Sequence, residues 1–288
     1  MAGIVLVHGI FNYVHGATPE EAGLRRTADC RPKLAESLAM LSVEIPEVVM
    51  AYYADLLRRE LPEQAQSARE TVLEDLSDGQ RAEAAQWLVA AGAPVPEDPQ
   101  NVGLVPLRQM LGWLVDERGG PLESAVREQL IRRLERTVVT NLREVEAYTS
   151  WPERRRRVRE RVAGVIRREA PSVVIAHSLG SYVAYETLHA FPELTVELLV
   201  TVGSPLRVPS LVRRLDPALR AGRGARPAGV KHWVNIADVG DVVAVPPKLS
   251  EVFPVDQDEV CDNGLGFHGL GGYLANGLLA AAIAPYIS

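Results

Sequence analysis

A strand that runs directly into a tight turn and a helix constrains this chain more than any other feature. In the segment SVVIAHSLGSYVA, an apolar β-branched run precedes Ser178 and a helical pattern follows it. Ala176 and Gly180 stand two positions before and after the serine, where a strained turn has no room for larger side chains. The segment predicts a strand over 172–177, a helix over 179–190 and a serine presented on the turn between them. A chance match is the alternative, and the flanking strand and helix count against it.

Strands and helices alternate along much of the chain. Near-continuous apolar runs are typical of strands that are buried on both faces of a parallel sheet. Their alternation with helical patterns predicts an α/β fold, with a mostly parallel sheet flanked by helices. The further strands are expected over 4–8, 48–52, 196–202 and 230–236, and the further helices over 31–41, over 152–169 and from about 270.

Residues 56–150 differ in character, because Glu, Arg, Gln, Ala and Leu dominate there with helical spacing. We expect an α/β core over 1–55 and 151–288, with a helical cap inserted over 56–150. The cap leaves the sheet at the carboxyl end of a parallel strand, so it should cover Ser178; the alternative is a segment folded to one side that serves dimerisation. Its helices are expected over 64–76, 79–91 and 122–147, with a Pro/Gly-rich break over 92–106. Five apolar residues of the cap either line an acyl pocket or pack against the core: Leu107, Met110, Leu111, Trp113 and Leu114.

The first strand ends in VHGIF, a His-Gly pair that closes a buried run. Gly9 permits a tight turn, after which the N–H of Ile10 can point at a developing oxyanion. The N–H of Leu179, at the start of the helix behind the serine, can supply a second donor. The sequence therefore predicts an oxyanion hole built from the main chain of Ile10 and Leu179. The alternative is a strand-end turn that carries a core histidine, His8.

A serine on such a turn needs an acid and a base, which follow it in the chain order Ser, Asp, His. Asp238 and Asp241 both lie after the predicted strand 230–236. His268, in a glycine-rich loop before the last helix, is the histidine that follows both aspartates. The candidate triad is thus Ser178, His268 and one of the two aspartates, while His189 and His232 are expected to be structural.

The stretches VHGIF, VVIAHSLGSYVAYETL, LLVTVGSPL, WVNIADVGDVVA and FHGLGGYL resemble the α/β-hydrolase superfamily. They are most similar to lipase- and esterase-like actinobacterial serine hydrolases, many of which carry the name of serine peptidases. The resemblance covers nearly all of the chain outside 56–150, and it implies Asp241 as the acid, because Val243-Ala244 follow it. In that superfamily a glycine is usual at the position of Ala176, two residues before the nucleophile. The chain also begins at the oxyanion strand, which implies a sheet reduced at the N-terminus by the first two strands of the larger fold.

The expected activity is hydrolysis of an ester, thioester or amide in a small-molecule or acyl substrate, through an acyl-enzyme. An acyltransferase, a thioester-processing enzyme or a peptidase would use the same triad, and a non-catalytic binding module would lack the triad geometry. No cofactor or metal is expected. Phe11, His15 and His177 are candidate pocket residues, although the His177 side chain is expected on the opposite side of the turn from Ser178.

Composition narrows the remaining classes. The 288 residues carry a formal net charge of −6, which argues against a nucleic-acid partner. The arginine-rich stretch 154–161 is interpreted as the solvated face of a helix. Cys30 and Cys261 are expected to be free thiols. The first apolar run is too short for a signal peptide, and no run reaches membrane-spanning length. We expect a cytoplasmic protein without a transmembrane segment, and the sequence leaves its oligomeric state open.

Overall fold

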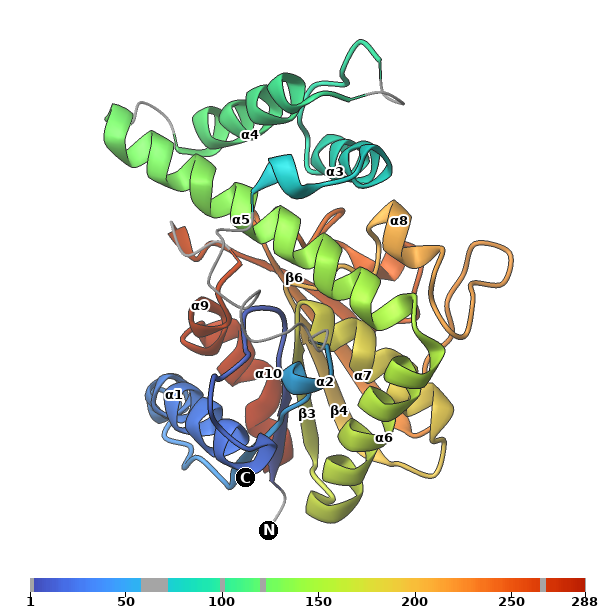
Figure 1. Cartoon of the computed structure of the whole chain (residues 1–288). Coiled ribbons are helices and arrows are strands. Elements are labelled where there is room, and N and C mark those ends of the chain that lie inside the picture. The colour runs from blue at the N-terminus through green and yellow to red at the C-terminus, as the bar shows by residue number, and fades with distance from the viewer. Residues whose placement is uncertain (1–2, 58–71, 99–101, 120–122, 265–267, 288) are drawn as a thin grey trace.

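A parallel β-sheet forms the centre of the molecule (Figure 1). The computed structural model describes residues 3–57, 72–98, 102–119, 123–264 and 268–287. Over these residues the six strands follow the order β2-β1-β3-β4-β5-β6, and every neighbouring pair is parallel. The prediction of an α/β fold with a parallel sheet flanked by helices is confirmed. The strands are β1 (Ile4–Val7), β2 (Val48–Ala51), β3 (Val173–His177), β4 (Val196–Val202), β5 (Val230–Asp238) and β6 (Gln257–Cys261).

Helices cover both faces of the sheet and its carboxyl edge (Figure 1). The helices are α1 (Pro19–Ala39), α2 (Ala54–Leu57), α3 (Asp78–Ala90), α4 (Leu104–Gly119), α5 (Ser124–Thr149), α6 (Pro152–Glu169), α7 (Leu179–Ala190), α8 (Pro209–Val212), α9 (Leu270–Leu274) and α10 (Gly277–Ile287). Short 3-10 turns span Leu73–Asp75 and Leu249–Glu251. None of the helices in the described ranges is both long and apolar enough to cross a bilayer.

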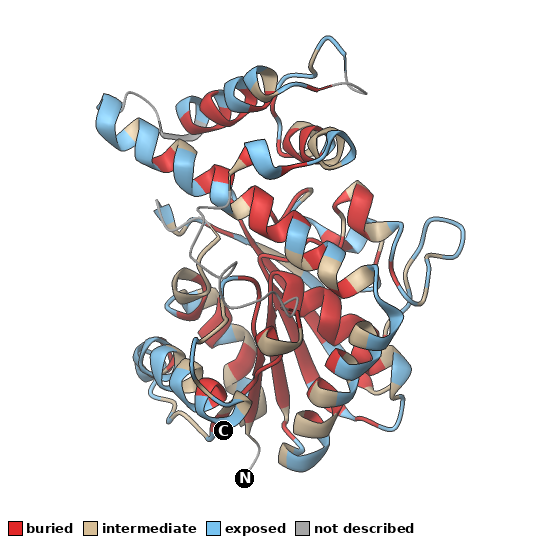
Figure 2. Ribbon diagram, viewed as in Figure 1, coloured by how far each residue is buried: buried red, intermediate tan, exposed pale blue. Residues whose placement is uncertain are grey.

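The sheet is buried on both faces, which explains its near-continuous apolar strands. Because side chains alternate along a strand, Ile4 and Leu6 pack into the core that α1 and α10 cover. Val5 and Val7 pack into the core on the side of α6 and α7. Figure 2 shows the buried residues running along the strands and the inner sides of the helices.

Helices α3, α4 and α5 lie together beyond the carboxyl ends of the strands (Figure 1). Helix α5 is amphipathic and reaches from α4 to α6, so it joins this group to the rest of the molecule. Buried apolar residues recur along it every three or four positions, with Val139 beside this stripe: Leu130, Leu134, Val138, Leu142, Val145 and Tyr148. In α4 the residues Leu107, Met110, Leu111 and Leu114 pack in the core, and Trp113 is 37% exposed.

Two predicted helices need correction, and two further elements are absent from the prediction. Helix α1 begins at Pro19 rather than at residue 31, because Thr18 forms a capping box with Glu21 and a proline is well tolerated in a first turn. Helix α4 was not predicted, since its Pro106 was interpreted as part of a break, although it too falls in a first turn. Strand β6 was missed because its polar residues carry no buried-strand pattern. The helix expected over 64–76 lies partly outside the described residues, and its end is a 3-10 turn.

The arginine-rich face of α6 is more than a solvated surface. Arg155 and Arg159 form ion pairs with Glu186 of α7, whose side chain is fully buried. Tyr148 of α5 donates a hydrogen bond to the same carboxylate, at 2.7 Å. A buried carboxylate requires this kind of pairing to offset its loss of hydration, so the cluster ties α5, α6 and α7 together.

Candidate active site

Ser178 occupies the turn between β3 and α7 in a strained conformation. Its φ of 54° and ψ of −131° lie in a region that non-glycine residues rarely adopt, at a cost of about 1–3 kcal/mol. Neighbouring main chain holds it there: the Ser178 N–H donates to the carbonyl of Val202 at 3.1 Å. A side chain at Gly180 would collide with the carbonyl oxygens of Val7 and His8, so the glycine lets α7 pack directly on the end of β1.

Two hydrogen bonds join Ser178, His268 and Asp241 into a chain. His268 Nε2 lies 2.8 Å from Ser178 Oγ, and His268 Nδ1 lies 2.8 Å from Asp241 Oδ2. Because a carboxylate can only accept, Nδ1 carries the proton and Nε2 is free to accept from the serine hydroxyl. The side chain of Asp241 is fully buried, and that of His268 is 12% exposed. This arrangement can move a proton from the serine to the imidazole and stabilise the resulting imidazolium.

The two aspartates have different partners. Asp241 Oδ1 accepts from the N–H groups of Val243 and Ala244, at 2.8 and 3.3 Å, which orients Oδ2 toward His268. Burial by itself would raise the pKa of Asp241, but the charge and hydrogen bonds of His268, with those of Tyr273 and Val243, bring it below its usual range. Asp238 instead accepts from the N–H groups of Gly240 and Asn263, and burial raises its pKa. Asp241, and not Asp238, therefore faces the imidazole.

Tyr273 and Gly203 also contact this chain, and sequence reasoning missed both. The Tyr273 hydroxyl donates to Asp241 Oδ2 at 2.7 Å and accepts from the Asp238 N–H at 2.9 Å. Gly203 has a φ of +57°, and a Cβ there would lie 2.8 Å from Asp241 Oδ2 and 3.3 Å from His268 Nδ1. The glycine directly after the apolar run of β4 was the available signal for a close approach at this point.

The β1 loop, residues 8–18, lies beside the serine. A Cβ on Gly9 would be 2.5 Å from the Cβ of Ser178, so only glycine fits there. Asn12 Nδ2 donates to the carbonyls of Gly9 and Ile10, at 3.1 and 2.8 Å, and fixes the direction of these peptide groups. Within the described part of the chain, the N–H groups of Ile10 and Leu179 donate to no acceptor. Both donors are therefore available near Ser178.

His8 is hydrogen-bonded to this loop and to Tyr53. The Tyr53 N–H donates to His8 Nε2 at 3.0 Å, so His8 Nδ1 carries the proton and donates to the Gly9 carbonyl at 2.8 Å. The Tyr53 ring stacks on the imidazole with centroids 4.1 Å apart. Burial lowers the pKa of His8 to about 4, so the ring stays neutral. His8 is thus a core histidine whose hydrogen bonds shape the β1 loop.

The prediction for the orientation of His177 is wrong. Its ring does not point away from the site; the ring centroids of His177 and His268 are 4.8 Å apart. His177 Nε2–H donates to the main-chain carbonyl of His268 at 2.8 Å. Burial lowers the pKa of His177 to about 3, so this donor persists at ordinary pH. His177 is therefore a residue that can hold the His268 loop in place.

Phe11 and His15 line a cavity of about 320 Å³ that His177 does not reach. Tyr13 of the β1 loop, Ala54 and Leu57 of α2 and Glu144 of α5 complete its wall. Phe11 directly follows Ile10, so the cavity adjoins the candidate oxyanion donor. Ser178 itself is fully buried.

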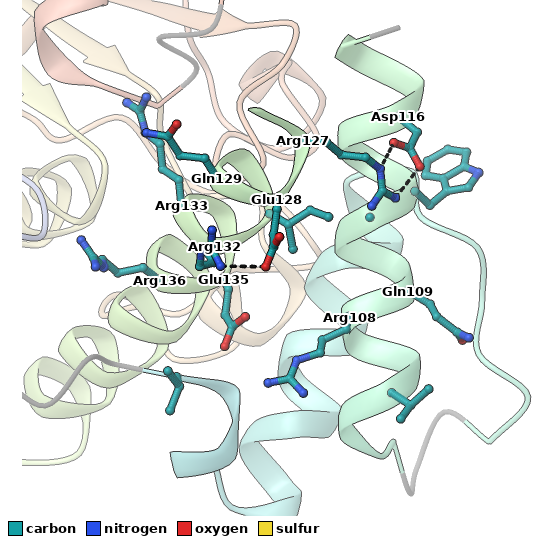
Figure 3. A pocket seen from close by; sticks show the side chains of 15 residues that line it. Arg108, Gln109, Asp116, Arg127, Glu128, Gln129, Arg132, Arg133, Glu135 and Arg136 are labelled. Carbon is teal, nitrogen blue, oxygen red and sulfur yellow. Dashed lines mark hydrogen bonds and ion pairs between the residues drawn. The ribbon is translucent and has the colours of Figure 1, made fainter. Parts of the chain in front are cut away.

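A larger cavity, of about 1180 Å³, lies between α4 and α5 (Figure 3). None of the candidate catalytic residues lines it. Its arginines point largely at acids: Arg127 Nε donates to Asp116 at 2.5 Å, and Arg132 donates to Glu128 at 2.7 Å. Among the residues that line it there is no Ser, Thr, Cys or His, so it offers no nucleophile–base pair. We therefore place the candidate chemistry at Ser178 and not in this cavity between α4 and α5.

No group of three or more His, Cys, Asp and Glu side chains in the described ranges is arranged to hold a metal ion. Comparison of the chain with protein-family models, with curated proteins and with solved structures finds no match. The geometry at Ser178 is therefore what indicates the function.

Proposed function

We propose that the protein is a serine hydrolase of the α/β-hydrolase fold with a Ser178–His268–Asp241 triad. One observation carries the proposal: an imidazole bridges a buried carboxylate and a serine hydroxyl at 2.8 Å on each side. The serine also has a positive φ between a parallel strand and a helix, as expected of a nucleophile elbow. Residues distant in the sequence meet here in the order and geometry that acyl transfer needs.

The reaction follows from these contacts. His268 Nε2 takes the proton of Ser178 Oγ as the oxygen attacks an ester, thioester or amide carbonyl. The N–H groups of Ile10 and Leu179 stabilise the oxyanion, each by about 3 kcal/mol. His268 then protonates the leaving group. A water molecule next attacks the acyl-enzyme while His268 takes its proton, and His268 returns that proton to Ser178 Oγ as the acid is released. Asp241 maintains the Nδ1–H tautomer and stabilises the imidazolium.

Two contacts support a cap role for residues 56–150. Trp87 Nε1 of α3 donates to the carbonyl of Val242, next to Asp241, at 2.6 Å. Glu144 Oε1 of α5 accepts from the N–H of Phe11, next to Ile10, at 3.3 Å. The helical segment thus touches both the loop that carries Asp241 and the β1 loop that carries Ile10. A cap in this place would control access to the serine.

Labelling with a fluorophosphonate probe tests the proposal. We expect a covalent adduct on Ser178 of the wild-type protein, because the probe reacts with activated serines. Ser178→Ala should remain folded, lose the label and lower kcat at least about a thousandfold. Ser150→Ala, at an exposed serine, should label like the wild type. An unlabelled but folded wild-type protein, or equal labelling of Ser178→Ala, would refute the triad.

The substrate bond is tested separately with p-nitrophenyl esters of increasing chain length, acyl thioesters and peptide amides. Turnover of the esters or thioesters with water as acceptor would establish hydrolysis. Dependence on an added alcohol or amine acceptor would instead identify an acyltransferase, and cleavage of amides alone a peptidase.

A further inference from the structure

The cavity beside the β1 loop contains a carboxyl group with no cation opposite it. Glu144 Oε1 accepts one hydrogen bond, from the Phe11 N–H at 3.3 Å. Among the residues that the structure describes, its other oxygen accepts no hydrogen bond, and no Lys, Arg or His forms an ion pair with it. Burial raises the pKa of Glu144 to about 7. A partly buried carboxylate costs free energy unless a positive charge compensates it, so the pocket is suited to a cationic ligand.

Aromatic rings form much of the remaining wall. Phe11 is 48% exposed, so its ring is accessible. Tyr13 lies edge-on to His15, with ring centroids 4.9 Å apart. Aromatic faces attract organic cations, and they do so best when the cation has little hydration to lose.

The character of the wall narrows the kind of cation. A primary ammonium is strongly hydrated and presents three N–H donors, whereas five of the six side chains that line this cavity are aromatic or apolar. A methylated ammonium needs no hydrogen-bond acceptors and gains from ring faces and a nearby negative charge. The volume of about 320 Å³ is sufficient for such a group with a short linker.

We propose that this cavity binds a methylated ammonium group, and that the protein acts on acyl compounds carrying that group close to the scissile carbonyl. The second half rests on the proposed function, because Phe11 of the pocket follows Ile10, the candidate oxyanion donor. Because Glu144 accepts from the Phe11 N–H, a group seated against it would lie beside the loop that carries the Ile10 donor.

Binding is measured first, because it does not require turnover. Titration calorimetry at pH 8 compares choline with 3,3-dimethylbutan-1-ol, which has the same shape without the charge. We expect choline to bind at least tenfold more tightly. Glu144→Gln should abolish this preference while its amide oxygen still accepts from the Phe11 N–H. Glu117→Gln, which removes the same charge from an exposed position of α4, should retain the preference. Phe11→Leu should weaken choline binding severalfold with the carboxylate intact.

Turnover is compared next, with acetylthiocholine and its uncharged isostere S-(3,3-dimethylbutyl) thioacetate. We expect kcat/KM to favour the cationic thioester at least tenfold in the wild type, and the ratio to approach one in Glu144→Gln. Equal binding of choline and the alcohol, or a preference that survives Glu144→Gln, would overturn the pocket assignment. Choline binding without fluorophosphonate labelling of Ser178 would instead uphold the pocket and refute the hydrolase.

Discussion

The two neighbouring aspartates differ in the hydrogen-bond partners of their carboxylate oxygens. The carboxylate of Asp241 shares Oδ2 between His268 and Tyr273, whereas Asp238 uses both of its oxygens to accept main-chain N–H groups. The first arrangement orients an imidazole, and the second closes a loop. Asp238 therefore has a structural task of its own, and its loss should affect stability more than chemistry.

Asparagine substitutions test this division. Asp241→Asn should lower kcat about a thousandfold or more, because an amide can present an N–H to His268 and favour the wrong tautomer. Asp238→Asn should lower the free energy of unfolding by about 1–3 kcal/mol, since one main-chain N–H loses its acceptor. Its kcat should fall less than about tenfold. Steady-state kinetics and urea unfolding of both variants give the ranking, and a larger kcat loss in Asp238→Asn would assign the acid to that residue.

At the scale of elements, a single tryptophan connects α3 to the loop that carries Asp241. Trp87 is fully buried, and its indole N–H satisfies the carbonyl of Val242. The helix is thereby anchored on the residue directly after the candidate acid. A substitution in α3 can thus alter the position of Asp241 without any contact with Ser178.

Trp87→Phe keeps an aromatic ring and removes the donor. We expect the free energy of unfolding to fall by about 1–3 kcal/mol, because a buried carbonyl loses its partner and a small cavity opens. kcat should fall as well, since the Asp241 loop loses its anchor. Trp113→Phe, at a partly exposed tryptophan of α4, is the matched control and should change stability by less than about 0.5 kcal/mol. Equal effects of the two substitutions in urea unfolding and in kcat would disprove the anchor.

Two buried imidazoles make the free energy of unfolding of the whole molecule depend on pH. Burial lowers the pKa of His8 to about 4 and of His177 to about 3, from about 6.5 in an unfolded chain. Below pH 6.5 the two histidines therefore bind protons in the unfolded chain but not in the folded protein. The stability that the neutral, buried histidines contribute is fully present above pH 6.5 and is lost as the pH falls toward 4. Glu144 opposes this trend, because its raised pKa means that the folded state binds its proton more readily.

His177→Gln removes one of these titrating groups while its amide can still donate to the His268 carbonyl. Between pH 6 and pH 4.5, the variant should lose less stability than the wild type, by up to about 1.4 kcal/mol per pH unit. His268, Asp241 and His8 face this ring, and the substitution leaves them in place. His232→Gln, at an exposed imidazole, should retain the wild-type dependence in urea unfolding across the same range. Parallel curves for the wild type and His177→Gln would contradict the expected proton uptake.

Much of the local structure was predictable, because its causes are local. Apolar runs, the small residues around Ser178 and the glycine-rich approach to His268 act over a few positions, so the bounds of α7 and β4 match the prediction. Prediction failed where a strand is mostly exposed and where a proline stands in the first turn of a helix. Strand β6 has a single buried residue and no apolar run. Helix α4 has apolar residues at helical spacing, but Pro106 near its start indicated a break.

The sequence by itself determined the fold class and narrowed the candidate site to a serine, a histidine and two aspartates in a defined order. Only the tertiary structure decided which carboxylate faces His268, that Tyr273 joins the two aspartates, and that His177 turns toward the site. It also brought Glu144 of α5 to Phe11, a contact between residues far apart in the chain. Chain order limits which residues can meet, but hydrogen-bond partners and burial arise from packing between distant segments, and no local pattern encodes them.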